Sequence, residues 1–221
     1  RREMLEFLSH DMRSPQSSIL LLARERRLPY DDSERLRLIA GEAERTLALA
    51  DTFVQLARLD SIDLDLAMLD LGDLVSEAVD RIRPWAGQHG LQIQVEIQAR
   101  PVIIAADRAL LERVVENLVG NAIKYCPADS TIAVAVGPDP SKPEHCLLTI
   151  ADDGPGLPDS RRADPFARFG ASEGAGRSGA GLGLAFVADV VEKTGGTIAV
   201  ETAPGEGTAF RLSFPKAGTE L

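Results

Sequence analysis

Residues 107–125 have the sequence DRALLERVVENLVGNAIKY, which predicts a helix. Asn117 and Asn121 are four residues apart and therefore share one face of that helix. Neutral amide oxygens on one face suit a Mg²⁺ ion that is held mainly by phosphate oxygens and water. Lys124 and Tyr125 follow and add a cation and a hydroxyl near the place where phosphates would lie. Two solvated asparagines on an exposed helix face are the simpler alternative.

A first glycine-rich cluster, Asp152-Asp153-Gly154-Pro155-Gly156, comes directly after a predicted strand. An ionised Asp152 at the strand end can accept a hydrogen bond from an exocyclic amine such as that of adenine. Gly154 and Gly156 allow backbone to approach a flat ring and permit positive φ. Taken alone, this cluster is better explained as a plain turn.

A second cluster, Gly179-Ala180-Gly181-Leu182-Gly183, precedes a predicted helix. Its amides can point at phosphates from the helix N-terminus. It also resembles a loose dinucleotide-binding fingerprint. No strand–helix–strand unit with a following acidic residue surrounds it, however, and no Walker-type lysine follows the glycines. These absences disfavour dinucleotide binding.

The first sixty residues predict two helices, with a break at residues 28–33. Pro29 ends one helix, and Asp32 or Ser33 can cap the next. In each helix the apolar positions recur at alternating steps of three and four, as in Leu5, Leu8, Met12, Pro15, Ile19 and Leu22, and then Leu36, Ile39, Ala43, Thr46, Ala50, Phe53 and Ala57. Such a seam is typical of helices that pack in a bundle. A two-helix hairpin cannot bury both seams, so we predict a dimeric four-helix bundle.

His10 is the candidate reactive residue of this hairpin. If Leu5 and Leu8 lie on the buried seam, His10 lies on the solvent side of its helix. Pro15 removes one backbone hydrogen bond and frees the carbonyl of Asp11, which bends the helix beside the histidine. A proline inside a helix costs about 3 kcal/mol, so we expect a functional reason for it. An exposed imidazole at a kink is a candidate site.

After Leu59 the pattern changes to an α+β order. We predict helices at 72–88 and 107–125 and a third that begins at the second glycine cluster and ends near Gly195. Predicted strands cover 64–71, 91–98, 102–106, 131–136 and 147–151, and two more follow Gly195. Residues 137–143 are expected to form a solvated loop, and the boundary between the hairpin and the rest falls at 60–65.

The composition limits the classes of function. The chain has 221 residues and a formal net charge of -10, which argues against general nucleic-acid binding. Cys126 and Cys146 are too few for a disulfide scaffold and are expected to be unpaired thiols; a reactive Cys126 beside the glycine cluster is the alternative. There is no signal peptide and no apolar run of membrane-spanning length. We expect a cytoplasmic fragment whose full-length protein can be membrane-anchored.

In this order the motifs resemble those of sensor histidine kinases of two-component systems, and the resemblance covers nearly the whole chain. The motifs are the histidine box His10–Pro15, the asparagine box Glu116–Tyr125, the glycine boxes Asp152–Gly156 and Gly179–Gly183, the phenylalanine box Pro165–Phe169 and the closing turn Gly205–Phe210. The resemblance implies a dimerisation and phosphoacceptor domain at 1–62. It also implies a catalytic α/β sandwich at 63–221, of the ATPase superfamily shared with gyrase, the ninety-kilodalton heat-shock chaperone and MutL.

The resemblance also implies a chemistry. His10 would attack the γ-phosphate of ATP, with Asp11 as orienter and general base. Asn117 and Asn121 would hold Mg²⁺, and the phosphoryl group would pass to an aspartate of a response regulator. The remaining nucleotide contacts would come from Lys124, Tyr125, Asp152, Gly154, Gly156, Arg177, Gly179, Gly181, Leu182, Gly183 and Thr208. A merely solvated Arg177 is an equal alternative.

Several departures keep other functions open. Gln16 replaces a usual hydrophobic residue, Ser14 stands where members with phosphatase activity carry Thr or Asn, and Gly170-Ala171 replaces an aromatic–arginine pair. The rivals are a serine/threonine kinase or anti-sigma factor of the same superfamily, a non-catalytic dimeric scaffold, and an unrelated ATPase. The His10 hairpin counts against the first. The lack of a water-activating Glu at Asn117 counts against the last.

Overall fold

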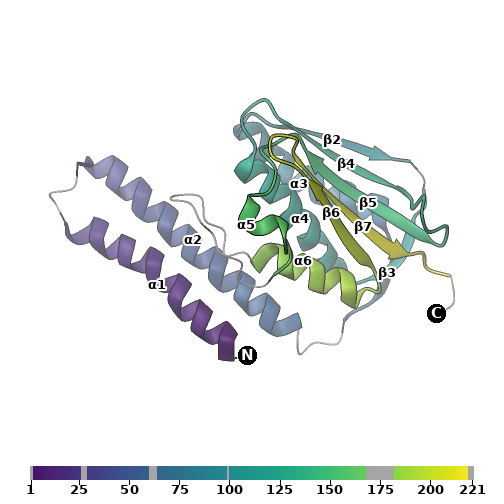
Figure 1. Cartoon of the computed structure of the whole chain (residues 1–221), viewed down its shortest axis with the longest axis horizontal. Helices are drawn as coiled ribbons and strands as arrows, with labels where there is room; N and C mark the ends of the chain where they lie inside the picture. Colours follow the sequence, from purple (N-terminus) through teal and green to yellow (C-terminus); the bar gives the residue numbers. More distant parts are fainter. Residues whose placement is uncertain (1, 26–28, 60–63, 99, 168–181, 219–221) are drawn as a thin grey trace. The chain divides into compact units, whose positions relative to one another are not determined.

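A computed structural model describes residues 2–25, 29–59, 64–98, 100–167 and 182–218. The chain divides into two compact units, one helical and one α/β. In the helical unit, α1 (Arg2–Arg24) and α2 (Asp32–Leu59) lie side by side (Figure 1). The helix α1 runs through Pro15, as predicted. Pro15 and Leu22 are buried, in agreement with the predicted seam.

The start of α2 differs from the prediction. Asp31, and not Asp32 or Ser33, caps this helix: its Oδ1 accepts from the N–H of Glu34 at 2.8 Å. The Glu34 carboxylate accepts in return from the N–H of Asp31 at 3.3 Å. This reciprocal pair is a capping box, in which two backbone donors of the helix start are satisfied together. Asp31 has the position three residues before Glu34 that this motif requires.

Large apolar side chains remain exposed on the helical unit. Leu36, predicted on the seam, is 67% exposed, whereas Ile39, Ala43 and Thr46 are half-buried. Among the described side chains of this unit, Leu20, Leu21, Tyr30 and Leu47 are exposed as well. The exposed leucines on α1 and α2 are therefore available for packing against further helices.

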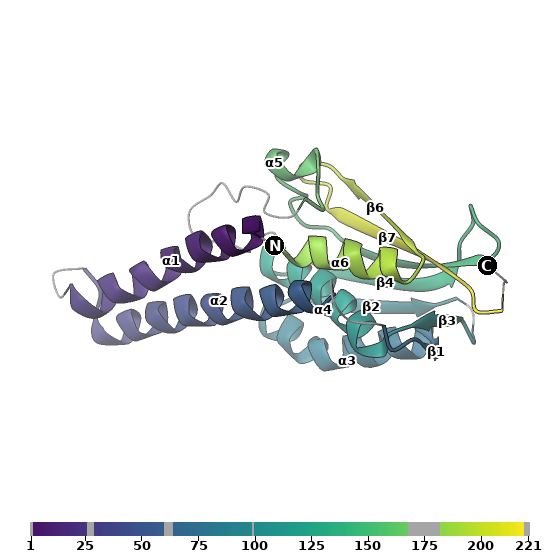
Figure 2. The same cartoon turned by 90° about the horizontal axis from the view of Figure 1, so that it is seen from below.

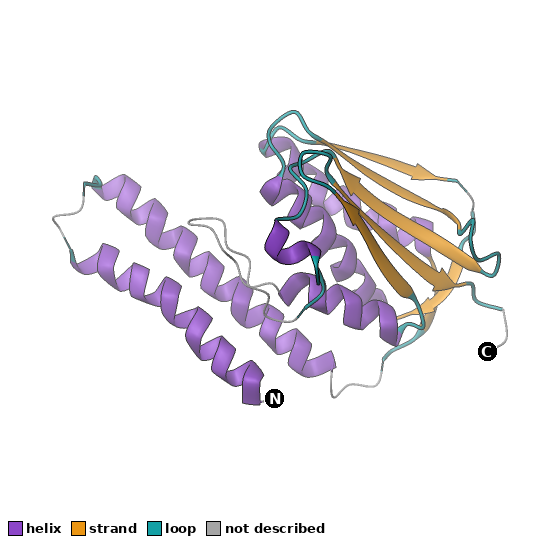
Figure 3. Cartoon of the chain, viewed as in Figure 1, coloured by secondary structure: helices purple, strands orange, loops and turns teal. Residues whose placement is uncertain are grey.

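The α/β unit is built on a five-stranded sheet with the order β2-β4-β5-β7-β6. Its strands are β2 (Gln92–Ile97), β4 (Thr131–Pro138), β5 (His145–Asp152), β6 (Thr197–Thr202) and β7 (Thr208–Pro215). The β2–β4 pair is parallel and the other pairs are antiparallel. The helices α3 (Leu71–Gln88), α4 (Arg108–Tyr125) and α6 (Leu182–Lys193) cover one face of the sheet, as Figures 2 and 3 show. The short α5 (Asp159–Arg162), which was not predicted, follows β5.

The core lies between this sheet and its helices. The largest fully buried side chains come from both layers and include Phe186, Phe214, Leu71, Leu74, Ile104, Leu111, Leu118, Ile123, Ile132, Leu148 and Ile150. The five strands keep their predicted places, since alternating burial follows alternating hydrophobicity along β4 and β5. This two-layer arrangement confirms the α+β fold class.

The predicted strand at 64–71 is largely wrong. Only Ala67–Asp70 forms a strand, β1, which pairs antiparallel with β3 (Ile103–Ala106) in a separate two-stranded sheet. Leu71 already belongs to α3, because the Asp70 side chain accepts from Gly72 N at 2.9 Å and caps that helix. Leu66 and Met68, whose alternation suggested a buried face, are 53% and 65% exposed.

The loop predicted as solvated, 137–143, contains a buried anchor. Asp139 is 6% exposed, and its Oδ1 accepts from Ser141 N at 2.8 Å and Ser141 Oγ at 2.6 Å. Its Oδ2 accepts from Ser213 Oγ on β7 at 2.5 Å. These donors hold the pKa of Asp139 below its usual range. The Asp139 carboxylate therefore fixes the loop to the sheet, and the Pro- and Gly-rich composition of the loop did not indicate this contact.

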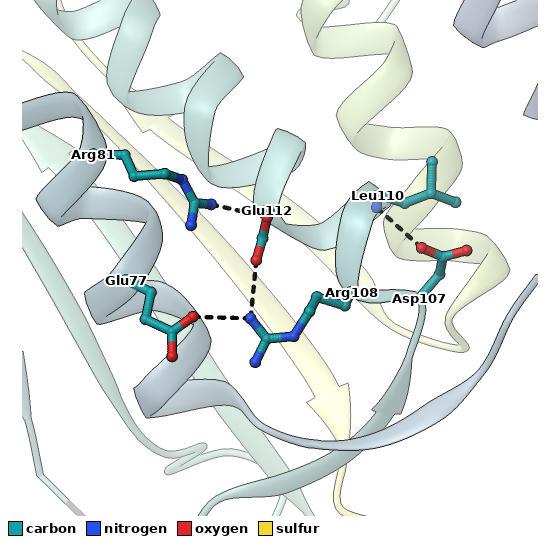
Figure 4. A network of polar contacts seen from close by, with 6 residues as sticks. All are labelled: Glu77, Arg81, Asp107, Arg108, Leu110 and Glu112. Carbon is teal, nitrogen blue, oxygen red and sulfur yellow. Dashed lines mark hydrogen bonds and ion pairs between the residues drawn. The ribbon is translucent and has the colours of Figure 1, made fainter.

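A charged cluster joins the outer surfaces of α3 and α4 (Figure 4). Arg108 donates to Glu77 and Glu112, both at 2.9 Å, and Arg81 pairs with Glu112 at 2.8 Å. The hydrogen bonds to Glu77 and Glu112 raise the pKa of Arg108. Asp107 caps α4 by accepting from Leu110 N at 3.2 Å. Because these ion pairs are exposed, they contribute little to stability.

Within the described ranges, no helix is long and apolar enough to cross a membrane.

Candidate nucleotide site

The asparagine face of α4 lies against the start of α6. Asn117 Nδ2 donates to Arg113 O at 3.0 Å, which orients the side-chain amide. A Cβ atom added to Gly183 would lie 3.0 Å from Asn117 Oδ1, so the amide oxygen lies close to the Gly183 backbone. Asn121 is half-buried one turn further along α4. The structure thus brings Asn117 and Gly183, 66 residues apart in the sequence, to one place.

The residues of this place fit a magnesium–phosphate group. Asn117 supplies a neutral amide oxygen beside a helix N-terminus, where backbone N–H groups favour anions. Among the described residues, no three His, Cys, Asp or Glu side chains gather as metal ligands. A Mg²⁺ ion held here would therefore depend on amide oxygens, phosphate oxygens and water, which is the ligand set this ion accepts.

Lys124 and Tyr125 end the same helix. Lys124 is exposed, and its Nζ lies 5.2 Å from the centre of the Tyr125 ring. A cation over a ring face is attracted by the π-electrons, which holds the ammonium near the end of α4. The predicted cation and hydroxyl are therefore adjacent and both reachable from solvent.

Asp152 ends β5 with a half-buried carboxylate. Its Oδ1 accepts from the backbone N–H of Gly154 at 3.0 Å. Burial raises the pKa of Asp152, and the Gly154 hydrogen bond opposes that change. A carboxylate in such a place gains from a ligand donor, because the ligand replaces part of the lost hydration.

Two glycines allow the loop after β5 to pack against the turn between β6 and β7. Gly156 has φ +78° and Gly207 has φ +83°, both in the left-handed region. A Cβ at Gly156 would collide with the carbonyl oxygen of Ala203, and a Cβ at Gly207 with that of Asp152. The close approach of these two segments therefore depends on glycine at both positions.

Thr202 joins the same two segments and was missed in the sequence. Its Oγ1 accepts from Leu157 N at 2.9 Å, donates to Gly207 O at 3.0 Å, and lies 3.3 Å from Thr208 Oγ1. Thr208, the predicted residue, is 7% exposed and directly opposite Thr202 in the β6–β7 register. In the sequence, the only signal for Thr202 was its position at the end of a strand. Its contacts could be identified only from the register of β6 against β7.

Several predicted residues fall outside what the structure describes. Arg177, Gly179 and Gly181 lie outside the described residues. The side chains of His10 and Asp11 do as well, although both residues belong to α1. Leu182 begins α6 and is buried.

A shallow pocket of about 400 Å³ lies elsewhere, lined by Asp65, Ala67, Asp107, Arg108, Ala109 and Glu112. It contains none of the predicted site residues.

The described residues thus form an α/β sandwich in which an acidic strand end lies beside a glycine-dependent turn and an asparagine-bearing helix lies against the start of α6. Residues 106–218, more than half of the chain, match the model of the histidine kinase-, DNA gyrase B- and HSP90-like ATPases. The chain belongs to this family, and it carries a histidine kinase catalytic domain.

Individual proteins support the same assignment. The chain is 31% identical over 220 residues to the sensor histidine kinase TmoS of Ectopseudomonas mendocina, covering 94% of this chain and 22% of TmoS. It therefore spans about a fifth of that relative. Full-length ShkA in complex with AMPPNP superimposes with a TM-score of 0.69 at 27% identity, covering 99% of this chain and 47% of ShkA.

The histidine kinase ThkA in complex with the response regulator protein TrrA has the same fold. Its TM-score is 0.79 at 19% identity, over 99% of this chain and 63% of that one.

Proposed function

We propose that this chain autophosphorylates on His10 with ATP and passes the phosphoryl group to an aspartate of a response regulator. In this proposal residues 1–62 form the dimerisation and phosphoacceptor domain, and residues 63–221 form the catalytic ATP-binding domain. The observation that carries the proposal is that the α/β unit matches the histidine kinase-like ATPase family and contains two close pairs of predicted site residues, Asn117 with Gly183 and Asp152 with Thr208.

In this proposal different residues bind the adenine and the phosphate end of the nucleotide. Asp152 accepts from the exocyclic amine of adenine, and Thr208 assists through water. Asn117 and Asn121 hold Mg²⁺, with Lys124 and Tyr125 near the phosphates. When bound, Mg²⁺ neutralises charge on the phosphate oxygens. Gly179, Gly181, Leu182 and Gly183 present backbone N–H groups to the phosphates, with Arg177 as a further cation. The structure of full-length ShkA in complex with AMPPNP, a relative with the same fold, supports a nucleotide as the ligand of this domain.

The phosphoryl transfer itself needs little covalent chemistry from the protein. One nitrogen of a neutral His10 imidazole attacks the γ-phosphorus, a new N–P bond forms, and the P–O bond to the β-phosphate breaks, releasing ADP. Asp11 orients the other ring nitrogen and accepts its proton. Neutral imidazole is available near pH 7, because the ordinary pKa of histidine is about 6.5.

The partners follow from the helical unit. The exposed Leu20, Leu21, Leu36 and Leu47 support a homodimer in which α1 and α2 of two chains form a four-helix bundle. The complex of ThkA with TrrA supports a response regulator receiver domain as the second partner. The net charge of -10 leaves no reason to propose nucleic acid as a third.

The decisive test is incubation of the chain with γ-labelled ATP and Mg²⁺, with His10→Gln alongside. We expect label that resists alkali, is lost in acid and is absent from His10→Gln. His89→Gln is the matched control, since His89 is an exposed histidine at the end of α3, and it should label like the parent. ATP binding without label in any of these proteins would favour the non-catalytic scaffold. Acid-stable label that persists in His10→Gln would exclude the proposal.

A further inference from the structure

Cys126 lies where the end of α4 meets the end of β5. It is the C-cap residue of α4, and its backbone N–H donates to Ala122 O at 2.9 Å. A Cβ atom added to Gly154 would lie 2.5 Å from Cys126 Sγ and 2.8 Å from Asp152 Oδ1. The sulfur and the carboxylate oxygen therefore flank the same glycine. At this point α4, which carries the asparagine face, therefore lies next to the end of β5, which carries the proposed adenine acceptor Asp152.

The chemistry of the two groups determines the direction of their interaction. An ionised carboxylate has only acceptors, so the thiol must supply the hydrogen. Burial raises the pKa of Cys126 to about 12, and the negative charge of Asp152 adds to this. The same thiol interaction acts on Asp152 in the opposite direction and lowers its pKa against the effect of burial. At neutral pH the thiol therefore keeps its hydrogen and can act as the donor.

The Asp152 carboxylate is held by donors from three elements. Its Oδ1 accepts from Gly154 N at 3.0 Å. The Cys126 thiol and the backbone of Thr208 also form hydrogen bonds with this carboxylate. A carboxylate held by several donors loses rotational freedom and keeps a defined direction. Among these donors, the thiol is the one that α4 contributes as a side chain.

We infer that Cys126 is a positioning residue that orients the Asp152 carboxylate toward the exocyclic amine of adenine, and that it thereby sets the preference for adenine over purines that lack this amine. The inference rests on the proposed nucleotide-binding function. It assigns Cys126 no role in phosphoryl transfer and no contact with the phosphates. Cys146, the other thiol, lies at the opposite end of β5, where it approaches Phe214 O at 3.6 Å.

The test compares two nucleotides that differ only in the amine. Dissociation constants for Mg²⁺-ATP and Mg²⁺-purine riboside triphosphate are measured by calorimetry on the whole chain and its variants. Cys126→Ala should weaken ATP binding about three- to tenfold and leave the purine analogue unchanged. This loss is smaller than that of a full hydrogen bond to a charged group, because a thiol is a weak donor and only the orientation of the acceptor is lost. Cys126→Ser keeps a donor and should retain the parental preference. Cys146→Ala, the matched thiol control, should retain it as well.

The outcomes distinguish a failure of this inference from a failure of the proposed nucleotide-binding function. A Cys126→Ala variant with unchanged preference, or with both affinities reduced in parallel, overturns the positioning role. Loss of the preference in Cys126→Ser to the same extent as in Cys126→Ala also overturns it. Asp152→Ala, which removes the acceptor, tests the proposed adenine contact itself: if this variant keeps the preference, the adenine role of Asp152 fails. If Asp152→Ala removes the preference and Cys126→Ala does not, only the inference about Cys126 fails.

Discussion

Replacement of Ser213 by alanine should destabilise the α/β unit by about 1.5–3 kcal/mol, the usual contribution of a hydrogen bond to a charged group. Ser213 is 6% exposed and donates to Asp139 Oδ2 at 2.5 Å, so water cannot easily replace the lost donor. Because the hydroxyl hydrogen goes to Asp139, Ser213 Oγ accepts from His145 Nδ1 at 3.1 Å. Asp139 keeps its two bonds from Ser141 and stays ionised.

The assay is urea unfolding followed by tryptophan fluorescence. Trp85 is the only tryptophan and lies in α3, so the signal reports on the α/β unit. With a slope of about 2 kcal/mol per molar urea, the midpoint should fall by about 0.75–1.5 M. Ser160→Ala, at an exposed position in α5, is the control and should stay within about 0.5 kcal/mol of the parent. A Ser213→Ala loss as small as that of the control would refute the reasoning.

The pH dependence gives a second check. The folded pKa of Asp139 is lowered, mainly by its Ser141 and Ser213 hydrogen bonds. Its contribution to stability is therefore complete above the unfolded pKa of about 3.9 and is lost as pH falls through the folded value. Removing the Ser213 donor moves the folded pKa upward. The difference between parent and Ser213→Ala should accordingly be constant near neutral pH and narrow below about pH 4. A difference that is equal at pH 7 and at the acid end would contradict this.

Three further predictions concern the cap of α4, the closing turn and the thiols. Asp107→Ala removes the acceptor for Leu110 N and should cost about 0.5–2 kcal/mol in the same unfolding assay, whereas Asp107→Asn should lose less; equal losses would argue against a capping role. Gly207→Ala should weaken ATP binding at least about tenfold in calorimetry, because a left-handed φ costs about 1–2 kcal/mol and its Cβ collides with Asp152 O. Gly205→Ala shares the positive φ but meets nothing within 4 Å, so an equal loss there would show that the collision is irrelevant. With thiol pKa values of about 12 for Cys126 and about 11 for Cys146, both should react with iodoacetamide at pH 7.5 at least about 100-fold more slowly than in the denatured chain. Mass spectrometry of the labelled peptides measures this, and fast labelling of folded Cys126 would show a reactive thiol instead.

The elements that were predicted well are those with a strong local pattern. The helix at 107–125 and the strand at 131–136 have periodicities that a few neighbouring residues define, and both lie in the structure within three residues of their predicted ends. The segment 64–71 has the same alternation and is mostly not a strand. Leu66 and Met68 are exposed, and Leu71, the buried residue of the segment, belongs to α3; the strand β1 pairs only with β3.

The candidate site likewise contains residues that could be predicted from local motifs and residues that could not. Asn117, Asp152 and the glycines were recognisable because each belongs to a short motif with its own chemical reason. Thr202 and Cys126 belong to no motif; their roles come from the register of β6 against β7 and from the meeting of α4 with β5.

Patterns along the chain are therefore enough to indicate the class of this protein, its nucleotide motifs and its helical hairpin, since these depend on residues a few positions apart. The hydrogen-bond partner of Asp139 on β7 could not be predicted from such patterns. Ser213 lies 74 residues away, and the strand order β4-β5-β7 brings it near the loop after β4. Strand order follows from the packing of the whole core, and hydrophobic periodicity contains no information on which strand becomes the neighbour of another. For that reason the contacts of Asp139, Thr202 and Cys126 could be identified only from the tertiary structure.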